Sequence, residues 1–188
     1  MLAALCAAIE SRDPYTRGHS ARTSELAVAL AERLDWSPAR VGALRLGGLL
    51  HDVGKLVVAE QLLRKAGPLK PIEFDTIRRH PVAGAQLLQA IPAARPGLAC
   101  VLFHHERWDG AGYPTGRAGK DIPIDARVLA VADAFDAMTT PRPYRRALSV
   151  SDALTEIIRC AGTQFDPELA LNFVQMWEQA AASARAAS

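Results

Sequence analysis

The sequence predicts an all-α fold, a compact helical bundle of about seven to nine helices. Apolar residues recur at helical spacing along most of the chain, as at Leu26, Leu30 and Leu34. Prolines stand where several of these runs begin, a position that the first turn of a helix favours. No stretch shows convincing strand alternation, because residues 57–58 and 122–124 are too short. These observations favour helices packed around one core.

Helix boundaries follow from capping residues and prolines. Pro14 breaks the first helix, and Ser37 is a good N-cap before Pro38. Gly54 is expected to end the third helix, and Asp125 to cap a later one. The expected helices cover residues 2–12, 19–34, 38–51, 59–65, 71–79, 81–90, 125–138, 151–161 and 167–185.

Between these helices lie breaks and one long loop. Prolines interrupt residues 92–97, and the apolar stretch that follows ends at His104 and His105. Residues 106–123 form a glycine-rich loop, and a loop of this size in a compact domain is usually functional. Residues 140–149 form a basic loop. We expect one domain over residues 1–179 and a frayed tail over residues 180–188.

Composition narrows the class of protein. The chain has 188 residues, 49% of them hydrophobic, which is enough for a folded domain with a core. A net charge of +2 argues against binding of a nucleic-acid polymer. Cys6, Cys100 and Cys160 are far apart and form no C-x-x-C motif, as in a reducing compartment. With neither a signal peptide nor an apolar run of roughly 20 residues, we expect a cytoplasmic protein that is not in a membrane.

The pair His51-Asp52 closes an apolar, helix-like run. A buried carboxylate without a partner costs several kcal/mol, and a metal ion is a natural compensation. Further ligands are available, because each of the other histidines lies near a predicted helix end, where side chains can converge. Asp133 also has apolar neighbours, and Asp136 lies one turn further on the same face. The candidate ligands are His19, His51, Asp52, His80, His104, His105 and Asp133.

Seven such groups are too many for one metal ion but suit two ions bridged by a carboxylate. Two ions about 3.5–4 Å apart fit phosphoryl chemistry, because they lower the pKa of a bridging water and stabilise the displaced phosphate. Any single member has a plainer explanation: a lone histidine at a helix end is more often structural, and Asp133 could pair with Arg127 or Arg145. The set as a whole favours the metal site.

This ordered set resembles the HD superfamily of metal-dependent phosphohydrolases, and the loop resembles the signature of its HD-GYP branch. The resemblance covers nearly the whole chain. The matching motifs are Asp13-Pro14-Tyr15-Thr16-Arg17-Gly18-His19, His51-Asp52, His80, His104-His105-Glu106-Arg107-Trp108-Asp109-Gly110-Ala111-Gly112-Tyr113-Pro114, Val131-Ala132-Asp133-Ala134-Phe135-Asp136, Arg142-Pro143-Tyr144-Arg145 and Phe165-Asp166-Pro167.

The resemblance implies an HD-domain bundle with a dinuclear site at converging helix ends. It implies one metal held by His19, His51, Asp52 and Asp133, and a second held by Asp52, His80, His104 and His105, so that Asp52 is the bridge. The ions of the family are usually iron or manganese, and the same ligands accept zinc or nickel. Similar proteins with a third metal use a glutamate where this chain has Tyr15, so we expect two metals although Asp136 is present.

The resemblance also implies a cyclic di-GMP phosphodiesterase in bacterial signal transduction, which yields pGpG and, where hydrolysis proceeds further, GMP by attack of a metal-bridging hydroxide. Asp52 and Lys55 are the expected catalytic residues. Lys55 is expected to reach a phosphate oxygen or the leaving group, and Arg142 and Arg145 to fork onto the second phosphate. The remaining substrate contacts are expected from Gly112, Tyr113 and Pro114.

Partners and alternatives stay open at this point. The 104–114 loop is linked in the family to partner proteins, including GGDEF-type cyclases, and family members commonly carry an upstream sensory or receiver domain. A homodimer is also open. Trp108 suits a packing anchor as well as a guanine platform. The alternative functions are an HD enzyme acting on another nucleotide, an HD-type di-iron oxygenase, and a catalytically weak module that binds cyclic di-GMP or docks a protein.

Overall fold

The computed structural model describes residues 5, 8, 18–65, 67–141 and 146–186. Over these ranges the chain is helical, and within them only one isolated β-bridge occurs, between Ala161 and Phe165. The predicted all-α class is therefore confirmed. The expected first helix, with Cys6 and Tyr15, lies outside the described residues, apart from residues 5 and 8.

The helices follow the order expected from the sequence, with short 3-10 turns between them. They are α2 (His19–Arg33), α3 (Pro38–Leu50), η2 (Val53–Val57), α4 (Glu60–Leu63), α5 (Pro71–Ile77), α6 (His80–Gln89), η3 (Pro92–Gly97), α7 (Leu98–Phe103), η4 (Gly119–Asp121), α8 (Ile124–Thr139), α9 (Val150–Arg159) and α10 (Pro167–Ala186).

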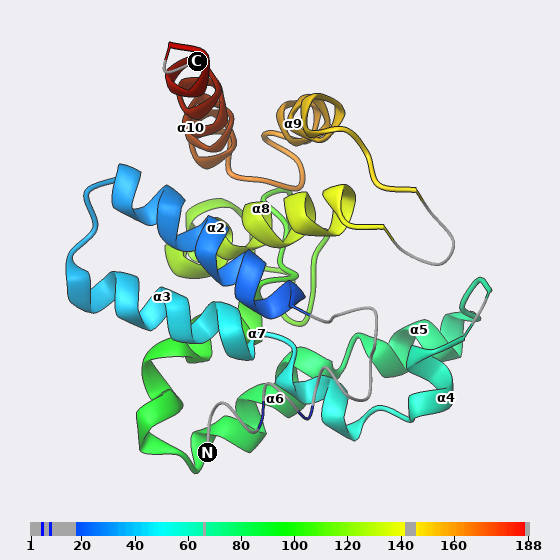
Figure 1. Cartoon of the computed structure of the whole chain (residues 1–188). Helices are drawn as coiled ribbons and strands as arrows, with labels where there is room; N and C mark the ends of the chain where they lie inside the picture. Colours follow the sequence, from blue (N-terminus) through cyan, green and yellow to red (C-terminus); the bar gives the residue numbers. More distant parts are fainter. Residues whose placement is uncertain (1–4, 6–7, 9–17, 66, 142–145, 187–188) are drawn as a thin grey trace.

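The main core lies between α2, α3, α7, α8, α9 and α10. α2 packs against both α3 and α8, and its inner face buries Ala27, Leu30 and Ala31 completely. Figure 1 shows α2 beside α3, with α9 and α10 at the far end of the molecule from α5 and α6. Phe173 of α10 joins this core through an edge-on contact with Phe135 of α8. This packing fixes the places where α2 and α8 present polar side chains.

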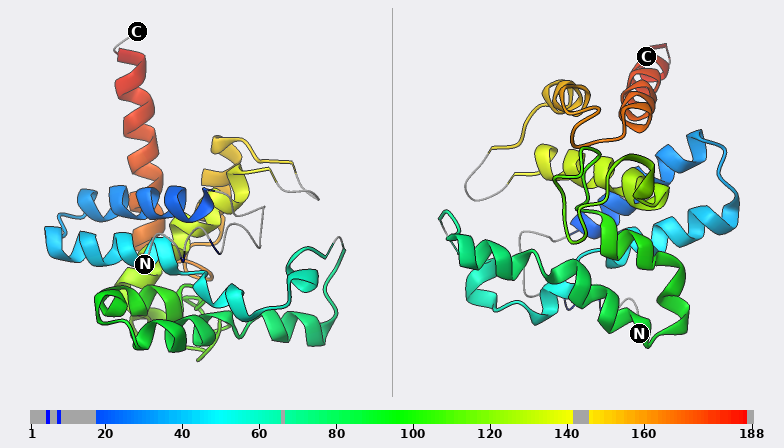
Figure 2. Two further views of the ribbon diagram at one scale, coloured as in Figure 1. Left: turned by 60° about the horizontal axis from the view of Figure 1, so that its bottom comes forward. Right: turned by 180° about the vertical axis from the view of Figure 1, so that it is seen from behind.

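A second, smaller apolar cluster holds α3, η2, α6 and α7 together. Its fully buried members are Leu50, Val53, Leu88, Ala94 and Val101. Leu50 and Val53 flank His51 and Asp52 in the chain, so the polar pair is carried into the interior by its neighbours. Both views of Figure 2 show α4 and α5 projecting to one side of the bundle that contains these clusters.

Gly54 lets η2 approach α6 unusually closely. A β-carbon at this position would lie 1.8 Å from the carbonyl oxygen of His80, which no side chain can tolerate. The expectation that Gly54 terminates the third helix is wrong: α3 ends at Leu50, and Gly54 lies inside η2. Its function is close packing, which brings Asp52 next to His80.

Two other boundaries differ from the sequence-based expectation. Pro123, not Asp125, is the N-cap of α8, and Asp125 lies in the first turn, where its carboxylate pairs with Arg40 at 2.9 Å. Residues 92–97, expected to break the chain, form the 3-10 helix η3. Pro92 and Pro123 lack a backbone N–H, yet a helix follows each of them. This is possible because the N–H groups at the start of a helix have no partner within the helix.

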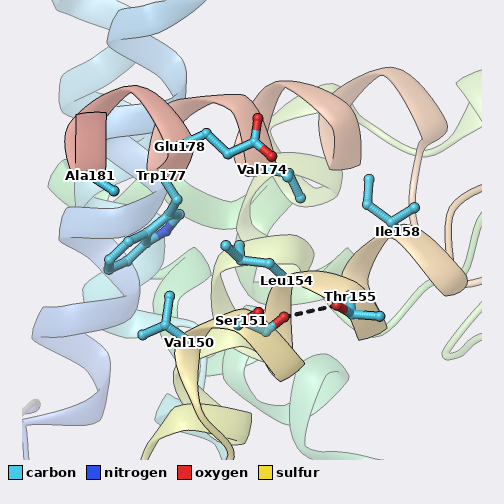
Figure 3. A pocket seen from close by; sticks show the side chains of 9 residues that line it. All are labelled: Val150, Ser151, Leu154, Thr155, Ile158, Val174, Trp177, Glu178 and Ala181. Atoms are coloured by element: carbon cyan, nitrogen blue, oxygen red, sulfur yellow. Dashed lines mark hydrogen bonds between the residues drawn. The ribbon is translucent and has the colours of Figure 1, made fainter. Parts of the chain in front are cut away.

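At the distal end, α9 and α10 enclose an apolar groove of about 670 Å³ (Figure 3). Its wall includes Leu154 of α9 and Trp177 of α10. None of the described helices combines the length and the apolar character that a membrane span needs.

Candidate metal centre

The five histidines occupy helix ends, as the sequence predicts. His19 is the first residue of α2, His80 is the first of α6, and His51 and His104 cap the C-terminal ends of α3 and α7. His105 follows directly. Four helix ends therefore meet at one point, and the imidazole rings of His51 and His104 are 5.0 Å apart.

Three of these rings have their tautomer fixed by the backbone. The Nδ1 atoms of His51, His80 and His104 lie 2.7, 2.8 and 3.0 Å from the carbonyl oxygens of residues 48, 77 and 100. A carbonyl oxygen only accepts, so each Nδ1 carries the proton and donates it. Each Nε2 is left with a lone pair that points into the centre, which is how metal-binding histidines are oriented.

The converging lone pairs need a cation. Nε2 of His51 is buried and has no hydrogen-bond partner among the described residues. Nε2 of His80 and Nε2 of His104 are only 3.4 Å apart, although neither carries a proton to share. Facing lone pairs repel each other, and a metal ion between them removes the repulsion. These donor atoms therefore fit metal ions.

Asp52 lies at the middle of the centre. It is 3% exposed, and its two carboxylate oxygens face different histidines: Oδ1 is 3.3 Å from Nε2 of His80, and Oδ2 is 3.5 Å from Nε2 of His51. Burial acts to raise the pKa of Asp52, but that pKa is held well below its ordinary value, chiefly by the positive charge of Lys55. The carboxylate is thus charged and shared between both halves of the site.

The potential ligand atoms form two groups that share Asp52. One group contains Asp52, His80, His104 and His105, and the other contains His19, His51 and Asp52, with the atoms of each group within 4.8 Å of one another. Asp133 adjoins the second group, since its Oδ1 lies 3.0 Å from Nε2 of His19. The structure brings all seven sequence-predicted ligands together. That they bind metal stays a prediction.

Most of the imidazoles are held neutral, the state in which they can bind a metal. Burial is the main cause that lowers the pKa values of His51, His104 and His105, in the last case to about 4. His19 differs. Burial opposes its protonation, but hydrogen bonds to Asp133 and Asp136 overcome this and raise its pKa to about 9.

Asp136 orients His19 from behind. Its Oδ2 accepts from Nδ1 of His19 at 2.6 Å, and its Oδ1 accepts from Nε of Arg22 at 2.6 Å. This arrangement leaves Nε2 of His19 facing Asp133. The sequence singles out Asp136 but gives no reason to choose Arg22, although His19 and Arg22 are three residues apart and lie on one face of α2. Arg127, offered as a plainer partner for Asp133, pairs instead with Asp166.

The 104–114 loop folds back onto His105. The backbone N–H of Tyr113 donates to the carbonyl of His105 at 3.1 Å, and the two rings stack with centroids 4.8 Å apart. Gly112 makes this possible, because a β-carbon there would come within 2.3 Å of the Arg107 nitrogen. Pro114 follows Tyr113 through a cis peptide bond. The loop therefore forms one wall of the centre.

Glu106 holds the end of the 104–114 loop through hydrogen bonds to Thr115. It is buried at 4% exposure, and its Oε1 accepts from both the backbone N–H and the hydroxyl of Thr115 at 2.7 Å. The sequence offered no reason to single out Thr115, because this contact depends on how the loop closes. Trp108 lies 5.7 Å from the guanidinium of Arg127, which favours its role as a packing anchor.

Of the basic residues predicted to bind substrate, Lys55 is at the centre, with its ammonium 2.7 Å from Oδ2 of Asp52. Arg142 and Arg145 lie outside the described residues. The structure also adds Arg78, which belongs to none of the sequence motifs: its guanidinium lies over the Tyr113 ring, 4.8 Å from the centroid.

Comparison with known proteins gives consistent results. The family model described as HD domain matches residues 4–169. The chain is 36% identical over 169 residues to a cyclic di-GMP phosphodiesterase of Thermotoga maritima, covering 89% of this chain and 46% of that protein. It is also 36% identical over 160 residues to the 3'3'-cGAMP-specific phosphodiesterase 3 of Vibrio cholerae, covering 85% of this chain and 35% of that protein. The chain thus spans less than half the length of these curated relatives.

Solved structures support the fold. A cyclic GMP-AMP specific phosphodiesterase of Vibrio cholerae superposes with a TM-score of 0.73 at 20% identity, covering 94% of this chain and 48% of that one. At this identity the similarity establishes a shared helical architecture and nothing finer.

Proposed function

The chain belongs to the HD domain family, and we propose that it is a metal-dependent phosphodiesterase that hydrolyses cyclic di-GMP to pGpG, and to GMP where the second bond is also cut. One observation carries the proposal: six other histidine and aspartate side chains gather around Asp52, whose two oxygens face separate groups of ligands. A purely structural cluster would not leave buried lone pairs opposed to each other.

We propose two divalent transition metal ions, iron or manganese by preference, with zinc or nickel also compatible with these ligands. His19, His51, Asp52 and Asp133 would hold one ion, and Asp52, His80, His104 and His105 the other. When bound, such ions supply a hydroxide nucleophile near neutral pH and Lewis-acid stabilisation of phosphate oxygens. Asp136 would keep His19 in the orientation that binding needs, through its 2.6 Å hydrogen bond.

Lys55 is the proposed catalytic cation of the chain itself. Its ammonium is next to Asp52 and one-fifth exposed, so it can contact a phosphate oxygen or the leaving oxygen of an incoming diester. Arg142 and Arg145 are proposed contacts of the second phosphate. Gly112, Tyr113 and Pro114 are proposed to line the entrance, where Tyr113 already stacks on His105.

The substrate is proposed as a cyclic dinucleotide, with cyclic di-GMP favoured over 3'3'-cGAMP. Both substrates occur in the names of similar proteins, so the family alone does not choose between them. We further propose that the protein acts in signal transduction, and that the 104–114 loop offers a surface to GGDEF-type cyclases.

The test is metal analysis after anaerobic purification, combined with product analysis from cyclic di-GMP. We expect two metal equivalents and a linear pGpG product that appears before any GMP. Hydrolysis of nucleoside triphosphates without cleavage of cyclic di-GMP would instead assign the chain to another class of HD enzyme. Binding of cyclic di-GMP with full metal content but without turnover would identify a binding module.

A further inference from the structure

The guanidinium of Arg78 is held in place by aromatic rings and takes no part in a hydrogen bond or ion pair among the described residues. Its Cζ lies 4.8 Å from the centroid of the Tyr113 ring and 5.6 Å from that of Phe74. Within the described ranges its guanidinium has no hydrogen bond and no ion pair. By contrast, Arg22 and Arg127 each pair with a buried carboxylate. Arg78 is therefore held by two aromatic faces, with its N–H donors available to a ligand.

This guanidinium lies next to the metal centre. Tyr113 contacts Arg78 and also stacks on His105, a proposed metal ligand. Arg78 and the proposed metal ligand His105 are therefore separated by a single side chain.

The surface beside Arg78 suits a planar base better than a bare phosphate. Phe74 is 46% exposed, although a phenyl ring gains by burial. An exposed aromatic ring offers a stacking face, and base stacking on aromatic side chains contributes about 1–3 kcal/mol per base in proteins that bind single strands. Arg78 therefore provides N–H donors for a hydrogen-bonded base, and Phe74 provides an apolar surface on which the base can stack.

We propose that Arg78 is a specificity-determining residue that reads a guanine base of the cyclic dinucleotide, an inference that rests on the phosphodiesterase function proposed above. The O6 and N7 atoms of guanine are both acceptors and match the two donors of a guanidinium fork. Adenine presents one donor and one acceptor at the same edge, a pattern that an amide side chain matches instead. An arginine at position 78 should therefore favour guanine, and an amide side chain at the same position should favour adenine.

The experiment compares the wild-type protein with Arg78→Gln and Arg78→Ala. Arg79→Ala is the matched control, because Arg79 is the adjacent arginine and is exposed. Each metal-loaded protein is assayed for kcat/KM on cyclic di-GMP, 3'3'-cGAMP and cyclic di-AMP. Bis(p-nitrophenyl) phosphate, a diester without bases, reports on the metal centre alone.

We expect the wild-type and Arg79→Ala proteins to prefer cyclic di-GMP. Arg78→Ala should reduce the ratio of the cyclic di-GMP rate to the cyclic di-AMP rate by about 5- to 100-fold, mainly through KM. Arg78→Gln should shift the ratio further toward adenine. Hydrolysis of bis(p-nitrophenyl) phosphate should be unchanged in all variants.

Three results would overturn the inference. An equal loss on all three dinucleotides in Arg78→Ala would mean that Arg78 only packs against the loop or contacts a phosphate. A wild-type protein that prefers cyclic di-AMP would refute the proposal that Arg78 recognises guanine, but it would still be a phosphodiesterase. Cleavage of bis(p-nitrophenyl) phosphate without cleavage of any cyclic dinucleotide would refute the proposed function, and the role of Arg78 with it.

Discussion

His19 and Asp136 are separated by 117 positions in the chain, yet Nδ1 of the one lies 2.6 Å from Oδ2 of the other. The contact joins the first residue of α2 to the fourth turn of α8, and Arg22 donates to both oxygens of the same carboxylate. Nδ1 of His19 thus donates to a side-chain carboxylate, whereas the Nδ1 atoms of His51, His80 and His104 donate to backbone carbonyls.

The first prediction concerns this contact. Asp136→Asn should weaken metal binding at the His19 site by about 10- to 100-fold, since loss of the partner that orients a ligand histidine costs this much in other metal sites. Titration of the metal-free protein with Mn²⁺ measures the loss. The matched control is Asp125→Asn on the same helix, where the carboxylate pairs with Arg40 at the surface. Equal affinities in both variants would show that Asp136 does not position His19.

The second prediction concerns pH. In the metal-free protein the pKa of His19 is raised to about 9, above an unfolded value of 6.5. A raised pKa stabilises the folded state fully below pH 6.5, and this contribution is lost as the pH rises through 9. The extra stability of the wild type over His19→Gln should therefore shrink by about 3 kcal/mol at most between pH 6 and pH 10.

Urea unfolding of both proteins with a chelator present measures this difference. Because other titrating groups are common to both proteins, their contributions cancel. A stability difference that stays constant from pH 6 to pH 10 would contradict the arrangement of His19 between two carboxylates.

The third prediction concerns Asp52. Asp52→Ala should lose both metal ions and all diesterase activity, because the carboxylate is shared by both ligand groups. The helical content should remain, since Leu50 and Val53 on either side keep their packing. Metal analysis, product analysis and far-UV circular dichroism together test this. An Asp52→Ala protein that retained one full metal equivalent and cleaved cyclic di-GMP would rule out the shared position.

The fourth prediction concerns Gly54. Gly54→Ala forces a methyl group against the His80 carbonyl, so the protein should lose about 1–3 kcal/mol of stability or more, as overpacked cores do. Metal affinity should fall as well, because η2 and α6 separate. Gly42→Ala is the control: no atom of the described residues lies within 4 Å of its added carbon, and an exposed helical alanine should raise stability by about 0.5–1 kcal/mol. Denaturant unfolding compares the two, and equal stabilities would argue against close packing at Gly54.

Local sequence predicted most of the helices, since their signals are contained in a few neighbouring residues. Ser37 and Pro38 begin α3 as expected, and Pro71 begins α5. The errors fall where a distant contact overrides the local pattern. Glycine is a residue that often ends helices, so the local sequence suggested this for Gly54. Glycine is needed there for another reason: the backbone of His80, which is distant in sequence, leaves no room for a side chain.

The candidate ligands were also readable from the sequence, because imidazole and carboxylate chemistry limits what an apolar chain can bury without a partner. The tertiary structure alone decided how they are grouped: which histidines face each oxygen of Asp52, and that Asp136 and Arg22 hold His19 from behind. It also placed Arg78 over Tyr113. Residue types are local properties of the chain, whereas distances between helix ends depend on how all the helices pack.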